Sequence, residues 1–257
     1  MSKYKEQIDK IRFSYSGLSN FAGCRHAWYL TYLEKHDRDG NAFSDYGLLV
    51  HETLEKFFRD ELQAFELSDY YLDNYDRMMV HPFPGFIDGK KYLEQGWQFF
   101  NNFSFDKDKY EVLIIEDKID VDLEKYNLVV KPDLVLKDKE TGRVILMDYK
   151  TSVLWKNSKI AKKDKEKLEG YKKQMNLYSK YLRTIGVNVD ECWLWFVRQE
   201  TDQIYKFDIL SEDEEILQSW IDETVEKINE EEEFPPTINN FFCRELCSVS
   251  QFCKYKP

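Results

Sequence analysis

The sequence predicts an α/β protein in which a mixed central sheet is flanked by helices. Three observations predict this class. Apolar residues recur with the helical period over much of the N-terminal part. From residue 111 on, the pattern changes to short stretches that are rich in β-branched residues and separated by turn residues. A long helical pattern and two more strand patterns follow, and this order favours helices layered on a mixed sheet.

The N-terminal part predicts four helices, and a serine near the start of the first can cap it. We expect them over residues 16–33, 44–65, 70–79 and 89–103. The stretch HPFPG at residues 81–85 separates the last two, because proline and glycine interrupt helices. Together they form an N-terminal helical elaboration that ends at about residue 106.

The rest of the chain predicts the sheet, two long helices and a tail. Strands are expected over residues 111–123, 128–136, 143–149, 191–199 and 204–209. The long helices are expected over residues 164–185 and 212–231. We therefore expect one domain over residues 1–257: the helical elaboration at about 1–106, a catalytic core at about 107–210, and a C-terminal helix and cysteine tail at about 211–257.

The net charge of −11 and the pI near 5.0 argue, over the chain as a whole, against a nucleic-acid partner. Binding is local, however, and lysines gather within residues 156–173. That cluster is either a solvated surface or a contact for phosphates. No apolar run approaches the ~20 residues that cross a bilayer. The polar N-terminus lacks the apolar stretch of a signal peptide, so we expect a soluble cytoplasmic protein.

The strand expected at residues 143–149 ends in an unusual way. Four apolar residues are followed by Asp148, Tyr149 and Lys150. Residues i and i+2 of a strand point to the same face, so Asp148 and Lys150 should project into one shared space. That space holds either a salt bridge at the surface, which contributes little, or a reaction centre.

A second carboxylate is expected nearby. Lys131, Pro132 and Asp133 interrupt an apolar strand, and proline in a strand marks an edge, an end or a bulge. Asp133 then lies near the hairpin partner of Asp148. Two such carboxylates repel each other unless a cation joins them, and Mg²⁺ and Mn²⁺ prefer oxygen ligands. A divalent ion there offsets charge on a phosphoryl oxygen, and Lys150 could orient a nucleophile or stabilise developing negative charge.

The stretch KPDLVL…GRVILMDYKTS resembles the signature of the PD-(D/E)XK nuclease superfamily, with Asp148 at the (D/E) position and Lys150 at the K. Three more motifs resemble its RecB-like branch, which includes the nuclease domains of RecB and AddB, CRISPR-associated adaptation nucleases and phage exonucleases. They are GLLVH at 47–51 (G-x-x-x-H), QMNLY at 174–178 (Q-x-x-x-Y) and SYSGLSNFAGC at 14–24. In many relatives a proline follows that last cysteine, where Arg25 stands here. The likeness extends over residues 14–253.

The resemblance implies a restriction-endonuclease-like core with a catalytic metal site. His51, Asp133, Asp148 and the backbone carbonyl of Tyr149 would bind Mg²⁺ or Mn²⁺, and Lys150 would position or activate the attacking water. Relatives often have Glu where Asp148 stands, and the shorter Asp could alter the geometry of the metal. Glu116 could add a carboxylate beside these ligands.

The same resemblance implies that Gln174 and Tyr178 hold the nucleic acid or support the site. The lysines just beyond the catalytic strand could line the path of the phosphates, and these are Lys156, Lys159, Lys162 and Lys163. Plainer interpretations stay open from the residues alone. A helical histidine such as His51 is often only a buried, satisfied side chain. Gln174 and Tyr178, four residues apart on a helix, could simply pair with each other.

Five cysteines are present, and three of them cluster in the tail. Three thiols need a fourth ligand for a tetrahedral Zn²⁺ site or an iron–sulfur cluster, and spacing alone does not choose between these metals or exclude buried small apolar residues. The family resemblance implies a [4Fe–4S] cluster that ties the chain ends together. Its ligands would be Cys24, Cys243, Cys247 and Cys253. Cys192, within an apolar strand, is expected to be a core residue.

The leading functional hypothesis is a metal-dependent DNA nuclease. The resemblance implies an exonuclease on single-stranded or unwound DNA ends, acting in recombination, repair, or phage or CRISPR DNA processing, in the cytoplasm of a bacterial, archaeal or phage-infected cell. The alternative is a weakly active or inactive DNA-binding subunit of a helicase–nuclease or recombination complex. The chain has no G-x-x-x-x-G-K-[ST] loop, so a helicase partner would have to be another polypeptide.

Overall fold

The computed structural model describes residues 2–156, 159–200, 203–209 and 211–257. They form two compact units, each built from several chain segments. The central unit comprises Ala42–Lys118 and Lys131–Asp213, and the terminal unit comprises Met1–Asn41, Ile119–Val130 and Glu214–Pro257. The predicted grouping into an elaboration, a core and a tail stays a prediction.

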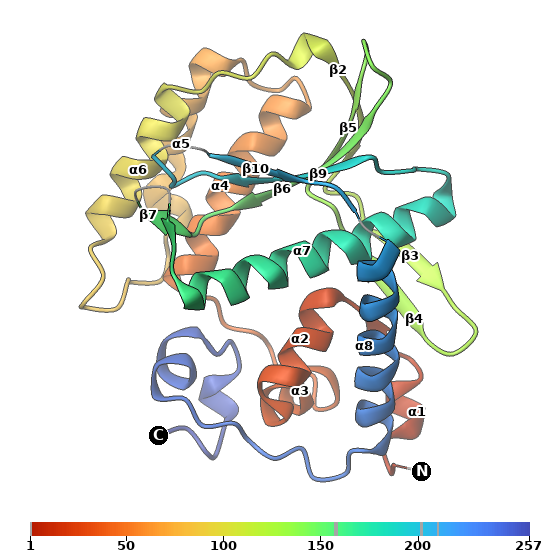
Figure 1. Cartoon of the computed structure of the whole chain (residues 1–257). Helices are drawn as coiled ribbons and strands as arrows, with labels where there is room; N and C mark the ends of the chain where they lie inside the picture. The colour runs from red at the N-terminus through yellow and green to blue at the C-terminus, as the bar shows by residue number, and fades with distance from the viewer. Residues whose placement is uncertain (1, 157–158, 201–202, 210) are drawn as a thin grey trace. The chain divides into compact units, whose positions relative to one another are not determined.

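The central unit contains a five-stranded sheet in the order β10-β9-β6-β5-β2 (Figure 1). Its strands are β2 (Tyr110–Ile115), β5 (Leu134–Asp138), β6 (Val144–Lys150), β9 (Glu191–Phe196) and β10 (Ile204–Phe207). Strands β6 and β9 are parallel, and the other neighbours are antiparallel. The expected mixed sheet flanked by helices is therefore confirmed.

Helices pack on the sheet of the central unit because its strands present apolar side chains on both faces. The first group of helices is α4 (Ala42–Phe58), α5 (Leu67–Met78) and α6 (Gly89–Asn101). Buried residues of this group form one core cluster with Met147, Tyr149 and Trp195 of the sheet. Residues that alternate with these in the strands, such as Lys150 and Phe196, contact helix α7 (Lys162–Leu182) instead. A small hairpin, β7 (Trp155–Lys156) and β8 (Lys159–Ile160), precedes α7.

The terminal unit brings the two ends of the chain together with one internal hairpin. Its elements are α1 (Lys5–Ile8), β1 (Arg12–Phe13), α2 (Tyr15–Gly23), α3 (Arg25–Tyr32), β3 (Ile119–Asp122), β4 (Asn127–Val130), most of α8 (Ser211–Glu230), a π-helical turn (Phe242–Leu246) and a 3₁₀ turn (Ser250–Phe252). Strands β1, β4 and β3 form a separate sheet in that order. Aromatic stacking joins its helices to the tail, for the rings of Trp28 and Phe234 lie 5.7 Å apart.

Two of the expected strands are each divided in the structure. The strand expected at 111–123 is two strands, β2 and β3, and the one expected at 128–136 is β4 and β5. The first break falls at Glu116, whose φ of 52° is left-handed and ends the extended backbone. The second falls at Pro132, which has no N–H for a strand ladder. The sequence pattern missed the first break because apolar alternation continues across it. It indicated an interruption at Pro132, but not that the interruption separates strands of two different sheets.

The helix expected at 16–33 is likewise divided. Cys24 separates α2 from α3 with an extended backbone, and its Sγ accepts a hydrogen bond from the Ala27 N–H, at 3.5 Å, as the N-cap of α3. The helix expected at 44–65 ends earlier, at Phe58, and is followed by Asp60 with a left-handed φ of 62°. In the described part of the chain, no helix is both long and apolar enough to cross a membrane.

Gly96 on α6 allows the helices of the central unit to pack closely. A Cβ there would overlap the Tyr71 hydroxyl and lie 2.8 Å from that of Tyr46, and both tyrosines are fully buried. We expect Gly96→Ala to destabilise the protein by about 1–3 kcal/mol, because the packed rings have no room to move. Gly47→Ala on α4 is the control, since nothing lies within 4 Å of its added methyl. That variant should gain up to about 1 kcal/mol. Urea unfolding of both measures the contrast, and equal effects would contradict it.

Candidate active site

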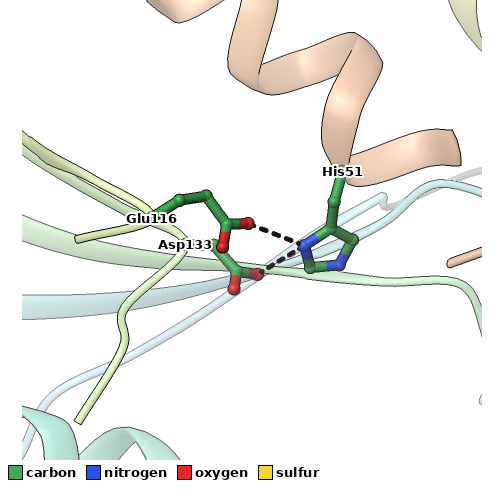
Figure 2. A group of neighbouring side chains, drawn as sticks. All are labelled: His51, Glu116 and Asp133. Carbon is green, nitrogen blue, oxygen red and sulfur yellow. Dashed lines mark hydrogen bonds and ion pairs between the residues drawn. The ribbon is translucent and has the colours of Figure 1, made fainter. Parts of the chain in front are cut away.

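Three titratable side chains from distant parts of the sequence converge in the central unit. His51 Nδ1 lies 3.1 Å from Glu116 Oε1 and 3.6 Å from Asp133 Oδ2. One ligand atom from each residue lies within 4.8 Å of the other two. Figure 2 shows the imidazole of His51 on its helix facing both carboxylates. Such an arrangement can hold a metal ion.

The ends of two strands place the carboxylates. Strand β2 ends at the left-handed Glu116, whose N–H donates to the Asp133 carbonyl oxygen at 3.1 Å. Asp133 immediately precedes β5, which pairs with both β2 and β6. Lys131 pairs with the other oxygen of Glu116, and its Nζ lies 2.5 Å from Oε2. The chain leaves the central unit just after Glu116 and returns to it just before Asp133. Both carboxylates therefore stand at strand ends, where they face His51.

Helix α4 supplies the histidine. Its buried side chains, including Val50 and Leu54, belong to the core of the central unit and fix the helix against the sheet. His51 Nε2 lies 3.3 Å from the carbonyl oxygen of Tyr149 on β6. Asp133 Oδ2 also accepts a hydrogen bond from the Tyr149 N–H, at 2.7 Å. The main chain of Tyr149 thus contacts both of these side chains.

Asp148 and Lys150 project into one space, as the strand period predicts. Asp148 is only 2% exposed, and its Oδ2 lies 2.5 Å from Lys150 Nζ. Lys150 also donates to Gln174 Oε1 at 3.0 Å, and Gln174 in turn donates to the Tyr178 hydroxyl at 2.9 Å. The ammonium lies 4.4 Å from the centre of the Tyr171 ring. Helix α7 therefore holds the lysine in place through three of its side chains.

The electrostatics of the site favour an added cation. Burial, and then the charge of Asp148, raise the pKa of Asp133 to about 7. Burial lowers the pKa of His51, but the carboxylates of Asp133, Glu116 and Asp148 outweigh it and raise that pKa to about 9. Once His51 has lost its proton to a competing metal ion, the donors are three carboxylates, one carbonyl and one imidazole, which fit a hard divalent ion. The residues present therefore fit Mg²⁺ or Mn²⁺.

The structure brings most of the sequence-predicted site residues together. His51, Asp133 and the Tyr149 carbonyl meet, while Asp148 lies beside them and pairs with Lys150. Glu116, expected only beside the ligands, contacts His51 directly. The side chains of Lys156, Lys159, Lys162 and Lys163 lie outside the described residues.

Sequence reasoning missed two residues of this site. Lys131 neutralises Glu116, and its position two residues before Asp133 was the available signal. Tyr171 contacts Lys150, and its place one helical turn before Gln174 could have identified it. These positions are weak signals, because lysine and tyrosine are common at such places. The contacts in the fold identify the two roles.

Four cysteines gather in the terminal unit. Cys24, Cys243, Cys247 and Cys253 line one pocket between α3 and the tail. Cys24 Sγ accepts hydrogen bonds from the N–H groups of Ala27, at 3.5 Å, and of Thr237, at 3.4 Å. Burial and then its three thiol neighbours raise the pKa of Cys247. Cys192 is fully buried in β9 of the central unit, as expected for a core residue.

Comparisons with known proteins agree with this geometry. None of the curated proteins compared with the chain gives a significant match. A crystal structure from Eubacterium rectale, provisionally described as an exonuclease, has a TM-score of 0.56 at 16% identity. That alignment covers 99% of this chain and 94% of the other, and it shows a similar fold. The structure of SSO0001 covers 94% of this chain and 96% of its own, at 16% identity and a TM-score of 0.33.

A family model decides the assignment. The model of the PD-(D/E)XK nuclease superfamily matches residues 12–254, which is nearly the whole chain. The matched range contains His51, Glu116, Asp133, Asp148 and Lys150. The chain therefore belongs to the PD-(D/E)XK nuclease superfamily.

Proposed function

We propose that this protein is a metal-dependent deoxyribonuclease of the RecB-like branch that acts as an exonuclease on single-stranded or unwound DNA ends. One observation carries the proposal: His51, Glu116 and Asp133 converge next to the buried pair of Asp148 and Lys150. Lys131 and Lys150 already pair with Glu116 and Asp148, but burial and the charge of Asp148 still raise the pKa of Asp133 to about 7. A further cation beside Asp133 would therefore be favourable.

Each residue of the site then has a role. His51, Glu116, Asp133, Asp148 and the carbonyl of Tyr149 hold Mg²⁺ or Mn²⁺. The bound ion offsets negative charge on the phosphoryl group during hydrolysis. Lys150, held by Gln174, Tyr178 and Tyr171, positions the attacking water and stabilises charge on the phosphate oxygens. The four lysines from Lys156 to Lys163 follow β6 in the sequence and supply cations for the phosphates of the substrate strand.

Exonuclease action is supported by two findings of different kinds. The similar structure from Eubacterium rectale is provisionally described as an exonuclease. The motifs at residues 14–24, 47–51 and 174–178 resemble those of the RecB-like branch, and that resemblance implies DNA processing in recombination, repair, or phage or CRISPR systems. A helicase or recombination partner fits the same setting.

The direct test is cleavage of DNA labelled at either end, single-stranded or double-stranded, by anaerobically purified protein. We expect cleavage with Mg²⁺ or Mn²⁺ and none with chelator. A ladder that shortens from one end gives the polarity of an exonuclease. A folded wild type that leaves all substrates intact, with metal present, would favour the DNA-binding subunit instead.

We further propose a [4Fe–4S] cluster on Cys24, Cys243, Cys247 and Cys253. The four cysteines line one pocket, as either a tetrahedral Zn²⁺ site or an iron–sulfur cluster requires. The resemblance of residues 14–24 to the RecB-like branch favours the cluster.

Loss of one of these thiols should remove the cluster and weaken the terminal unit. We expect Cys247→Ser to abolish absorbance near ~400 nm and to lower the melting temperature, since the cluster closes a long loop between the chain ends. Cys192→Ser is the control and should keep the absorbance, because this cysteine lies in the other unit. Iron and zinc analysis of the wild type accompanies the spectra, and stoichiometric zinc without iron would contradict the assignment.

A further inference from the structure

The central unit contains a pocket of about 410 Å³ between α6 and the end of β9. Helix α6 and the loop after it form one wall. The other wall is formed by the end of β9 and by the residues that lead to β10. Its volume lies in the range of pockets that bind small organic groups. None of the roles proposed for the metal centre uses this pocket.

Neutral amides dominate the lining of this pocket. Five of its residues carry a primary carboxamide: Gln95, Gln98, Asn102, Gln199 and Gln203. Three aromatic side chains, Phe99, Phe103 and Trp195, form its apolar part, and the rings of Phe103 and Trp195 stack with their centres 5.5 Å apart. A carboxamide both donates and accepts hydrogen bonds, so this lining matches a flat group with donors and acceptors on its edge.

The charges of the pocket argue against a phosphate as its occupant. Among the residues that line it, Arg198 is the single cation. Its Nε donates to Gln95 Oε1 at 2.8 Å, and its guanidinium lies 3.4 Å from the centre of the Tyr92 ring. Glu200 balances its charge. A nucleobase suits the pocket better, since it is neutral, has a face that stacks on aromatic rings, and has an edge of donors and acceptors.

The pocket is joined to the catalytic strand by hydrogen bonds. The Val197 N–H donates to the Lys150 carbonyl oxygen at 3.0 Å. Arg198 Nη1 donates to the Thr151 carbonyl oxygen at 3.3 Å. These two bonds attach the wall of the pocket to the main chain at the end of β6, while the Lys150 side chain lies on the face of the sheet that contacts α7.

We propose that this pocket binds one unpaired nucleobase of the substrate strand and sets its register at the metal centre. The inference rests on the proposed nuclease function and gives a physical reason for a preference for unpaired DNA, because a paired base cannot enter. Hydrogen bonds within the protein fix the orientation of the Gln98, Asn102 and Gln203 amides, and their remaining N–H and oxygen atoms can bond the edge of a base. Base stacking of this kind is independent of sequence.

Single-stranded oligonucleotides with one abasic position, moved stepwise along the strand, test the pocket. Their affinity for the full-length protein is measured by fluorescence anisotropy in chelator, and their cleavage is then followed with Mg²⁺. We expect one abasic position, fixed relative to the cleaved end, to weaken binding about tenfold. The double variant Gln98→Leu, Asn102→Leu should lose this position dependence, since both residues are exposed on the pocket and their replacement removes two amides without emptying the core.

The control is Asn101→Ala, an exposed amide of α6 that does not line the pocket, and it should behave like the wild type. The proposed base pocket would be wrong if every abasic oligonucleotide bound with equal affinity. It would also be wrong if the double variant kept the position-dependent loss of affinity, even with normal cleavage. A position-dependent penalty in a protein that cleaves nothing would support the pocket while the nuclease proposal fails. The two failures are therefore distinguishable.

Discussion

We expect Asp148→Asn to reduce the proposed metal-dependent cleavage at least about 10³-fold while the protein stays folded. The amide is a weak ligand for a divalent ion, and it leaves Lys150 without the carboxylate that lies 2.5 Å from its Nζ. The stability change should stay within about 2 kcal/mol, because two effects oppose each other. The ion pair with Lys150 is lost, but the repulsion between Asp148 and Asp133 is lost as well. Single-turnover cleavage and thermal unfolding measure the two quantities.

Asp45→Asn is the control for Asp148→Asn. It tests whether loss of any buried, paired carboxylate lowers the cleavage rate. Asp45 is 6% exposed on the same helix as His51, and its Oδ2 lies 2.9 Å from His81 Nδ1. This variant also removes a buried carboxylate from an ion pair, but outside the candidate site, so its cleavage rate should stay within a few-fold of wild type. Equal losses in both variants would make the effect structural. More than about a tenth of the activity remaining in Asp148→Asn would remove Asp148 from the site.

The sequence predicted the sheet and its helices well where periodicity and chain breaks agree. Strand β6 and the helices α6, α7 and α8 lie within two or three residues of their expected bounds. It missed the break at Glu116, where apolar alternation continues, and it did not predict that the interruption at Pro132 separates strands of two different sheets. There the chain leaves the five-stranded sheet, forms the hairpin of β3 and β4, and returns. Which strands pair with each other decides whether a stretch is one strand or two, and the pattern of a single sequence does not show this pairing.

The candidate site was more predictable than the fold around it. The period of a strand predicts that Asp148 and Lys150 share one face, and Pro132 predicts the placement of Asp133. Both rules apply over a few residues, so a single sequence is enough to use them. Glu116 was underestimated, since its contact with His51 depends on a left-handed residue at the end of β2. The amide pocket beside β9 was not predicted at all. Its residues come from α6 and from a loop about a hundred positions later, and no periodicity relates them.

The buried carboxylates make a second large effect measurable, through stability instead of cleavage. Burial and the charge of Asp148 raise the pKa of Asp133 to about 7, so its ionised carboxylate is unfavourable while no metal ion is bound. Asp133→Asn should therefore melt higher than the wild type in chelator. The asparagine Oδ1 can still accept the Tyr149 N–H, and Glu116 still pairs with His51.

Divalent metal should reverse that order. At a concentration of Mg²⁺ or Mn²⁺ about 100 times the dissociation constant, the wild type gains about 2.7 kcal/mol, or about 5–10 °C in melting temperature for a chain of this size. Asp133→Asn, with one ligand lost, should gain little, so the two melting curves exchange places between chelator and metal. Asp117→Asn removes an exposed carboxylate next to Glu116 and should respond to metal as the wild type does. A variant that melts below the wild type in chelator and gains as much from metal would identify Asp133 as a structural residue. The exchange of order is specific to a metal ligand, because a residue that only supports the fold has no reason to destabilise it when the ion is absent.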